Sequence, residues 1–157
     1  NEGARQMKIT TLFFGEIEVQ DSDIVTFTQG VPGFEELTQF TLVQPADSAP
    51  FSYFQSVQEA GLAFLVTDPF LFFKDYELSI PDSVQAELKI EKQEDVLVWS
   101  VVTVNDDFTK ITLNLLAPII WNVQEKLAKQ IILHDSEYNV KHEIMLSEVG
   151  EATQVEG

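Results

Sequence analysis

The chain has 157 residues, of which 26 are acidic and nine basic, so its net charge is −17; 45% of the residues are hydrophobic and none is cysteine. These values predict one folded domain, argue against disorder and exclude disulfide bonds and thiolate catalysis. An acidic surface repels phosphate backbones, so we expect no direct nucleic-acid binding and an attraction for basic proteins instead. The alternative is that the charge serves only solubility.

The two ends of the chain differ in composition from the middle. Residues 1–6 precede Met7 and are interpreted as a remnant of cloning, so that a single β domain spans residues 7–146. Residues 147–157 are acidic with little to bury, which predicts a flexible tail. No apolar run approaches the roughly 18 residues of a membrane span, and no secretory signal is visible, so we expect a cytoplasmic protein with no membrane contact.

The N-terminal region alternates apolar and polar side chains. Residues 8–20 do so across Gly15, which predicts one bent strand or two strands broken at the glycine. Residues 23–28 predict a short strand in which Val25 and Phe27 face inward.

A tight turn is predicted where two glycines bracket a proline, at Gly30, Pro32 and Gly33. Phe34 follows directly, and we expect its ring to enter the core and hold the turn in place. The role predicted for these four residues is structural.

Three apolar segments predict the next strands, at residues 40–43, 51–57 and 62–67. Asp68-Pro69 ends the last of them, because a residue before proline is disfavoured in helical geometry and Asp favours a turn.

Aromatic and charged side chains are interleaved directly after this turn. An extended strand cannot direct all of these rings to one core, because its side chains alternate between two faces. The simpler interpretation makes the three phenylalanines core residues. The functional interpretation is a docking surface of exposed rings rimmed by acids, formed by Phe70, Phe72, Phe73, Asp75 and Glu77.

One helix is predicted, at residues 82–88, because Pro81 and an early acid fit a helix N-terminus. The chain is then organised around a β-hairpin of residues 96–104 and 108–115. Its first strand is almost entirely apolar and is expected to be buried on both faces, whereas the second alternates. Asp106 and Asp107 lie in the turn that joins them.

A second hairpin is predicted after Pro118, which is taken with Asn114 as a strand end. Residues 119–123 predict its first strand. Helix propensity favours a helix from residue 124 to 133, but two apolar segments around a short polar link favour a return strand at 130–134. Residues 141–145 add an edge strand.

These elements predict a mostly β fold. About nine or ten short strands, one helix and no alternation of strands with helices indicate a small antiparallel β-barrel-like or sandwich domain with one short helix.

Groups that could catalyse a reaction or bind a metal are sparse. The two histidines, His134 and His142, lie in no nucleophile motif. Together with Asp135 and Glu143 they could form a metal site on paper, but the spacing is not that of a metal motif. We therefore predict no catalytic residue, no cofactor and no enzyme; the alternatives are a small-molecule or carbohydrate-binding β-barrel and a metal-dependent hydrolase that uses both histidines.

Several motifs, in this order and spacing, together resemble the FliW family of flagellar assembly factors. They are Gln29-Gly30-Val31-Pro32-Gly33-Phe34-Glu35, Phe54-Gln55-Ser56 with Leu62-Ala63-Phe64, Asp68-Pro69-Phe70 with Asp75-Tyr76, and Asn114-Leu115-Leu116-Ala117-Pro118 with Asn122 and Gln130. The resemblance covers nearly all of residues 7–146.

The resemblance implies a bacterial cytosolic β-barrel-like protein without enzymatic activity, with two protein partners. One partner is flagellin before export, and the other is CsrA, an RNA-binding translational repressor of flagellin synthesis. In this family the FliW protein sequesters CsrA until unexported flagellin takes FliW away, so that flagellin controls its own translation. We expect the free protein to be a monomer.

The resemblance supplies no list of contact residues. For partner binding we predict Phe70, Phe72, Phe73, Asp75 and Glu77, with Asp106 and Asp107 at the hairpin tip as secondary candidates.

Overall fold

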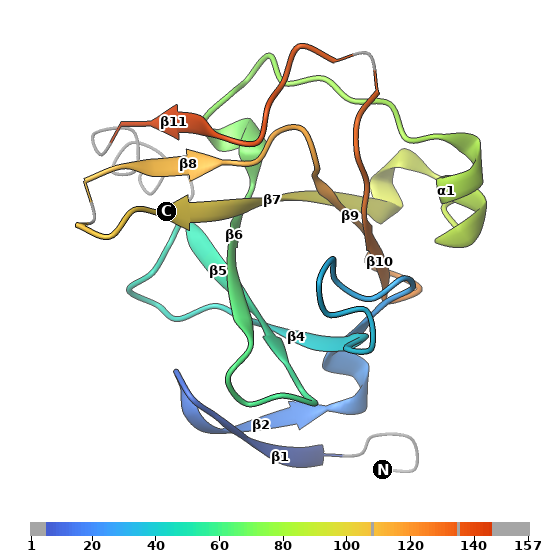
Figure 1. The fold of residues 1–157 in the computed structure, drawn as a ribbon. Coiled ribbons are helices and arrows are strands. Elements are labelled where there is room, and N and C mark those ends of the chain that lie inside the picture. Colours follow the sequence, from blue (N-terminus) through green and yellow to red (C-terminus); the bar gives the residue numbers. More distant parts are fainter. Residues whose placement is uncertain (1–5, 108, 135, 146–157) are drawn as a thin grey trace.

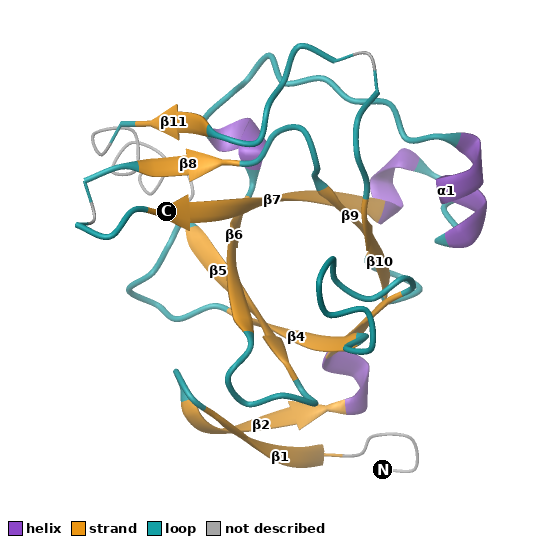
Figure 2. Ribbon diagram, viewed as in Figure 1, coloured by secondary structure: helices purple, strands orange, loops and turns teal. Residues whose placement is uncertain are grey.

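The chain is mostly β, as the sequence predicts. The computed structural model describes residues 6–107, 109–134 and 136–145, and this part of the chain contains eleven strands, one α-helix and three short 3-10 turns. The helical segments lie around the outside of the strands (Figure 2). The strands are β1 Gln6–Thr11, β2 Gly15–Gln20, β3 Ile24–Phe27, β4 Gln39–Val43, β5 Phe51–Ser56, β6 Ala63–Thr67, β7 Val96–Val104, β8 Ile111–Leu113, β9 Ile119–Asn122, β10 Leu127–Gln130 and β11 His142–Ile144.

Seven of these strands form a closed ring (Figure 1). Around the ring, β7 is followed by β6, β5, β4, β3, β10 and β9, and β9 pairs back with β7. Each pairing in the ring is antiparallel except that of β3 with β10, where Leu127 lies opposite Thr26 in a parallel register. The chain therefore adopts the barrel rather than the sandwich.

Strand β7 is the centre of the fold. Its first residues pair with β9, Ser100 and Val101 pair with β6, and its last residues pair with β8. The predicted central hairpin of β7 and β8 is confirmed, and β11 adds an edge strand to β8. The expectation that β7 is buried on both faces is wrong at two residues, because Leu97 is 45% exposed and Thr103 is also exposed.

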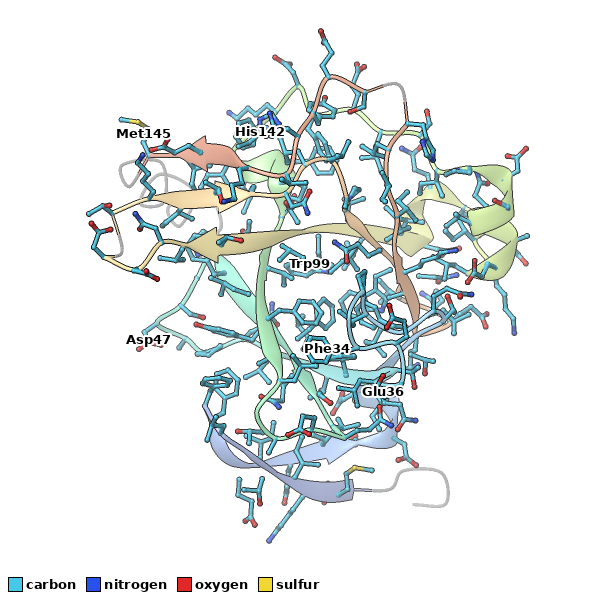
Figure 3. The ribbon with its side chains drawn as sticks, in the orientation of Figure 1. Phe34, Glu36, Asp47, Trp99, His142 and Met145 are labelled. Atoms are coloured by element: carbon cyan, nitrogen blue, oxygen red, sulfur yellow. The ribbon has the colours of Figure 1, made fainter. Side chains whose placement is uncertain are left out.

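The inside of the ring is filled by aromatic side chains. Phe27, Phe40 and Phe54 are buried there, with the ring centroids of Phe27 5.1 Å from Phe40 and 5.5 Å from Phe54. Such edge-to-face contacts are favoured by the charge distribution of aromatic rings. Trp99 of β7 and Trp121 of β9 pack against the same cluster, and Figure 3 shows Trp99 inside the ring.

A second apolar cluster lies outside the ring, against β7, β8 and β9. It includes Tyr76, Leu88, Leu113, Ile120 and Ile131. Ile119 faces the interior and Ile120 the outer cluster, because successive side chains of a strand point to opposite faces. Two apolar layers on one sheet explain why β7 and β9 read as nearly continuous apolar runs.

The helix α1, Asp82–Glu87, confirms the prediction and is fixed at its end by a buried side chain. Asn122 Nδ2 donates hydrogen bonds to the carbonyl oxygens of Leu88, at 2.8 Å, and Lys89, at 3.1 Å. These bonds satisfy carbonyl groups that a helix C-terminus leaves without a partner.

Glu87 links the same helix to strand β10 and to the segment that follows β3. Its Oε1 accepts from Lys129 Nζ at 2.8 Å, and its Oε2 accepts from Thr28 Oγ1 at 2.6 Å and Gln29 Nε2 at 3.0 Å. The hydrogen bond from Lys129, followed by those from Thr28 and Gln29, lowers the pKa of Glu87 to about 2.

The predicted turn at residues 30–33 is present and lies over one mouth of the ring (Figure 1). Gly30 and Gly33 have φ angles of 68° and 88°, and the Phe34 N–H donates to the Val31 carbonyl at 2.7 Å. The expectation that Phe34 enters the core is wrong, because its side chain is exposed. Val31 and Leu37 pack against the ring cluster and occupy the mouth in its place.

The structure also fixes the boundaries of the N-terminal strands and of the second hairpin. Residues 15–20 form a separate strand that pairs with β1, so the two-strand interpretation of the N-terminal region is confirmed, with Gln6 opposite Gln20. The second hairpin is also confirmed, but β10 begins at Leu127 rather than Gln130, because a tight turn needs only residues 123–126. Residues 1–5 and the predicted tail at 147–157 lie outside the described residues.

Candidate functional site

A broad groove of about 1200 Å³ lies on the outside of the ring beside α1. Residues 96–98 of β7 contribute one side of it. The connection from β6 to the helix contributes residues 76–81, and the segment after β10 contributes residues 132–134 and 136–138. The groove therefore lies where three segments distant in sequence meet.

Three large apolar side chains of this groove are exposed to solvent. They are Phe70 at 39%, Leu97 at 45% and Ile132 at 64%. Isolated exposed apolar residues are normal, but several in one groove are typical of a protein-binding surface.

The groove is acidic as well as apolar. Four carboxylates line it, against one lysine and one histidine: Asp68, Glu77, Glu91 and Glu137. Burial raises the pKa of Asp68, although its Oδ1 accepts a hydrogen bond from the Phe70 N–H at 2.9 Å. The ion pair formed by Lys129 and Glu87 is the only salt bridge of the described residues, so the groove carboxylates have no cation bound to them there.

Tyrosine hydrogen bonds hold the connection from β6 in place. Tyr76 is buried and its hydroxyl donates to the Leu115 carbonyl at 2.7 Å, while Tyr138 Oη accepts from the Glu77 N–H at 2.9 Å. Burial, and secondly Tyr138, raises the pKa of Tyr76. The backbone beside Glu77 is therefore fixed by its neighbours.

The predicted docking residues separate into three groups. Phe70 and Glu77 line the groove, and Asp75 is exposed but does not line it. Phe72 and Phe73 are half-buried against the outer cluster, where Phe72 stacks on Phe51 with centroids 6.3 Å apart. The core interpretation thus describes Phe72 and Phe73, and the exposed-ring interpretation describes Phe70.

The acidic hairpin tip lies elsewhere. Asp106 and Asp107 are exposed at the far end of β7, roughly 25 Å along the strand from the groove at about 3.3 Å per residue. Asp107 Oδ1 accepts from Thr109 Oγ1 at 2.8 Å, and this bond lowers the pKa of Asp107. The role that these contacts give Asp107 is to shape the turn.

The structural motif residues near β8 also have defined contacts. Asn114 Oδ1 accepts from the Ala117 N–H at 3.0 Å, and Pro118 is buried with its carbonyl accepting from the Ile131 N–H at 2.9 Å. These bonds shape the passage from β8 to β9.

The two histidines occupy different surroundings. His134 is exposed and lines the groove, whereas His142 lies on β11 (Figure 3) with its ring next to Phe73 and Tyr138. His142 Nε2 accepts from the Asn139 N–H at 2.9 Å. Among the residues that the structure describes, no group of three or more histidine and carboxylate side chains could hold a metal ion.

Leu97 and Ile132 were not identified as surface residues from the sequence. Each lies within an apolar run, which is also the pattern of a buried strand, so no sequence signal separated them from their neighbours. None of the helices in the described ranges has the length and hydropathy to cross a bilayer.

Known proteins similar to this chain in sequence and fold belong to one family. The family model for FliW protein matches residues 8–144. The flagellar assembly factor FliW of Clostridium botulinum (strain 657 / Type Ba4) is 39% identical over 142 residues, covering 90% of this chain and 99% of that protein. The same factor of Bacillus subtilis (strain 168) is 42% identical over 138 residues, covering 88% and 96%.

A solved structure supports the assignment. The crystal structure of a flagellar assembly factor FliW has a TM-score of 0.83 and 41% sequence identity to this chain, covering 88% of this chain and 97% of that one. These relatives carry the name of an assembly factor rather than of an enzyme. The chain therefore belongs to the FliW family of flagellar assembly factors.

Proposed function

We propose that this protein acts in the cytoplasm, without enzymatic activity, by binding unexported flagellin and by sequestering the translational repressor CsrA. Flagellin that accumulates before export takes the protein from CsrA, and the released repressor lowers flagellin translation. The observation that carries this proposal is membership of the FliW family over nearly the whole described chain.

The surface of the protein supports binding of this kind. The groove combines exposed Phe70, Leu97 and Ile132 with an acidic lining, and the chain as a whole has a net charge of −17. An RNA-binding protein such as CsrA presents basic surfaces to phosphates, and an acidic partner attracts such surfaces over long range. The ring interior is filled by packed aromatic side chains, which does not favour the small-molecule-binding alternative.

The direct test is capture of purified partners. The immobilised protein should retain purified CsrA and, separately, purified flagellin, and adding flagellin to the complex with CsrA should release CsrA. If the immobilised protein retained neither CsrA nor flagellin, the proposal would be overturned.

Charge reversal tests whether the predicted acids contribute. Replacing Asp75 and Glu77 by Lys should weaken CsrA binding roughly tenfold, a loss of about 1.4 kcal/mol, and leave the unfolding midpoint unchanged because both side chains are exposed. Asp47→Lys is the control, since Asp47 (Figure 3) is exposed on the β4–β5 loop and does not line the groove. Equal affinity of the double variant and the control would remove Asp75 and Glu77 from the binding surface.

Electrostatic repulsion supplies a mechanism for inhibition of CsrA. A protein with 26 acidic residues, bound beside the RNA surface, places negative charge near the phosphate path and lowers RNA affinity even without covering the site. Such repulsion is screened over about 8 Å at physiological salt. The ratio of the RNA affinity of free CsrA to that of the complex should therefore shrink as salt is raised, although both affinities fall; an unchanged ratio with an intact complex would exclude repulsion as the cause.

A further inference from the structure

The groove contains a stretch of β7 that has a strand neighbour on one side only. Strand β6 pairs with β7 through Val66 opposite Val101 and Thr67 opposite Ser100. The chain then leaves the sheet at Asp68 and turns through a 3-10 segment, Pro69–Leu71. Continuing the register would place Pro69 opposite Val98, and a proline has no N–H to donate to the strand.

The register of β7 shows which backbone groups face this open side. The Val123 N–H donates to the Asp95 carbonyl, and the Asn114 N–H donates to the Val101 carbonyl, each at 3.0 Å. Because backbone groups of a strand alternate between its two edges, the odd-numbered residues face β9 and β8 and the even-numbered residues face β6.

Two residues of the groove therefore have backbone groups available. The Val96 N–H donates to the Gln93 carbonyl, and no donor among the described residues bonds to the Val96 carbonyl. Val98 has neither its N–H nor its carbonyl paired within the described part of the chain. Both residues are half-buried and line the groove. An open strand edge is the usual template for adding a strand from another chain.

The segment after β10 presents a similar edge to the groove. The N–H groups of Ile131 and Leu133 donate to the carbonyls of Pro118 and Leu116, each at 2.9 Å. The backbone groups of Ile132, between them, point to the opposite edge of the segment. The exposed side chain of Ile132 lines the groove.

The charge of the lining selects the occupant. Asp68, Glu77, Glu91 and Glu137 outnumber the cationic side chains of the groove, which favours a basic segment. The chain's own residues 147–157 contain three glutamates and no lysine or arginine, so their charge opposes binding there.

We propose that the groove takes an extended segment of a protein partner as an added strand along residues 96–98 of β7. Its apolar side chains lie against Phe70, Leu97 and Ile132, and its Lys or Arg side chains lie against the acidic lining, as in other cases of strand addition. This inference rests on the proposed protein-binding function and specifies its binding mode.

The test uses a synthetic peptide of three Val-Lys repeats, capped at both ends and labelled with fluorescein. Binding is followed by fluorescence anisotropy, and amide hydrogen exchange of the isotope-labelled protein is followed by NMR. We expect saturable binding and exchange of the Val98 amide slowed at least tenfold, because the peptide pairs with that N–H. No binding, or binding without slower exchange at Val98, would overturn the proposal.

Two matched peptides and two variants sharpen the result. The same peptide with every backbone nitrogen methylated has no N–H to donate along either edge and should bind at least tenfold more weakly; equal binding would overturn strand addition. A Val-Glu peptide should not bind, and its binding would overturn the charge argument. Glu77→Lys combined with Glu137→Lys should weaken the Val-Lys peptide about tenfold, whereas Asp47→Lys should not.

The complexes with whole proteins separate this inference from the proposed function. Capture of flagellin and CsrA with no slowing at Val98 in either complex leaves the function in place and overturns strand addition. Capture of neither protein overturns the function. A free protein that self-associates and slows Val98 exchange assigns the edge to a second copy of the chain and overturns the choice of occupant.

Discussion

The interior of the ring and the outer groove are built on the same strand but are covered differently. Inside, Trp99 of β7 packs against Phe54, whose side chain has no exposed surface. In the groove, Leu97 and Ile132 remain largely exposed. The strands of the ring pair with one another all the way round. In the groove, by contrast, the edge of β7 at residues 96–98 has no paired strand, because β6 turns away from it. Stability should therefore depend on the interior, and binding on the groove.

The largest expected effect is removal of an interior ring. Phe54→Ala deletes a side chain that contacts Phe27, Phe64 and both tryptophans, so it should lower the free energy of unfolding by about 3–5 kcal/mol. Phe70→Ala should cost less than about 1 kcal/mol, since its ring is partly exposed. Urea denaturation of both variants measures the contrast, and similar losses would show that the interior is not the main source of stability.

The next effect concerns the join between the ring and its outer layer. Asn122→Ala leaves the carbonyls of Leu88 and Lys89 without their donor and should cost about 2–3 kcal/mol. Asn122→Asp keeps the acceptor for Gln124 but places a carboxylate against two carbonyl oxygens, so it should cost at least as much. An Asp variant as stable as the wild type in urea would contradict this role of the amide nitrogen.

The turn over the ring mouth offers a matched pair of glycines. Both have positive φ, but a Cβ at Gly30 would overlap the Glu35 backbone, whereas a Cβ at Gly33 meets no atom within 4 Å. Gly30→Ala should therefore cost about 2 kcal/mol and Gly33→Ala about 1 kcal/mol. Thermal unfolding of the two variants distinguishes them; equal shifts would mean that the close approach to Glu35 relaxes freely.

The smallest expected effect is the contribution of Glu87 to the free energy of unfolding, which depends on pH. The folded-state pKa of Glu87 is lowered to about 2 from an ordinary 4.5, so its stabilising contribution is present above about pH 4.5 and is lost as the pH falls towards 2. Glu87→Gln should cost about 1 kcal/mol near neutral pH, because the pair is partly exposed. The difference in unfolding free energy between wild type and variant should shrink across that interval, and a constant difference would exclude ionisation of Glu87 as its origin.

The ring strands could be predicted from the sequence because their constraints are local. Val25 and Phe27 alternate with Thr26 and Thr28, and Asp68-Pro69 ends a strand. The closure of the ring could not be predicted in the same way. It depends on parallel pairing of Thr26 with Leu127, which lie about 100 residues apart and leave no mark in either local pattern.

The groove could be predicted only in part. Acids beside Phe70 indicate a ring that is not fully buried, whereas Leu97 and Ile132 belong to apolar runs that look the same in a covered strand. Phe34 shows the opposite error: an apolar residue in a turn was assigned to the core, but Val31 and Leu37 already occupy that position. Exposure at these residues is decided by what the rest of the chain places over them.

The parallel seam between β3 and β10 has a consequence for synthesis of the protein. Strands β3 to β6 form a meander of neighbouring hairpins that can assemble soon after leaving the ribosome. Their free edge at β3 has no neighbour until Leu127 and Ala128 have emerged. Until then the nascent chain exposes an unpaired edge and its phenylalanine-rich face, so a chain stopped before residue 127 is the form most prone to aggregate.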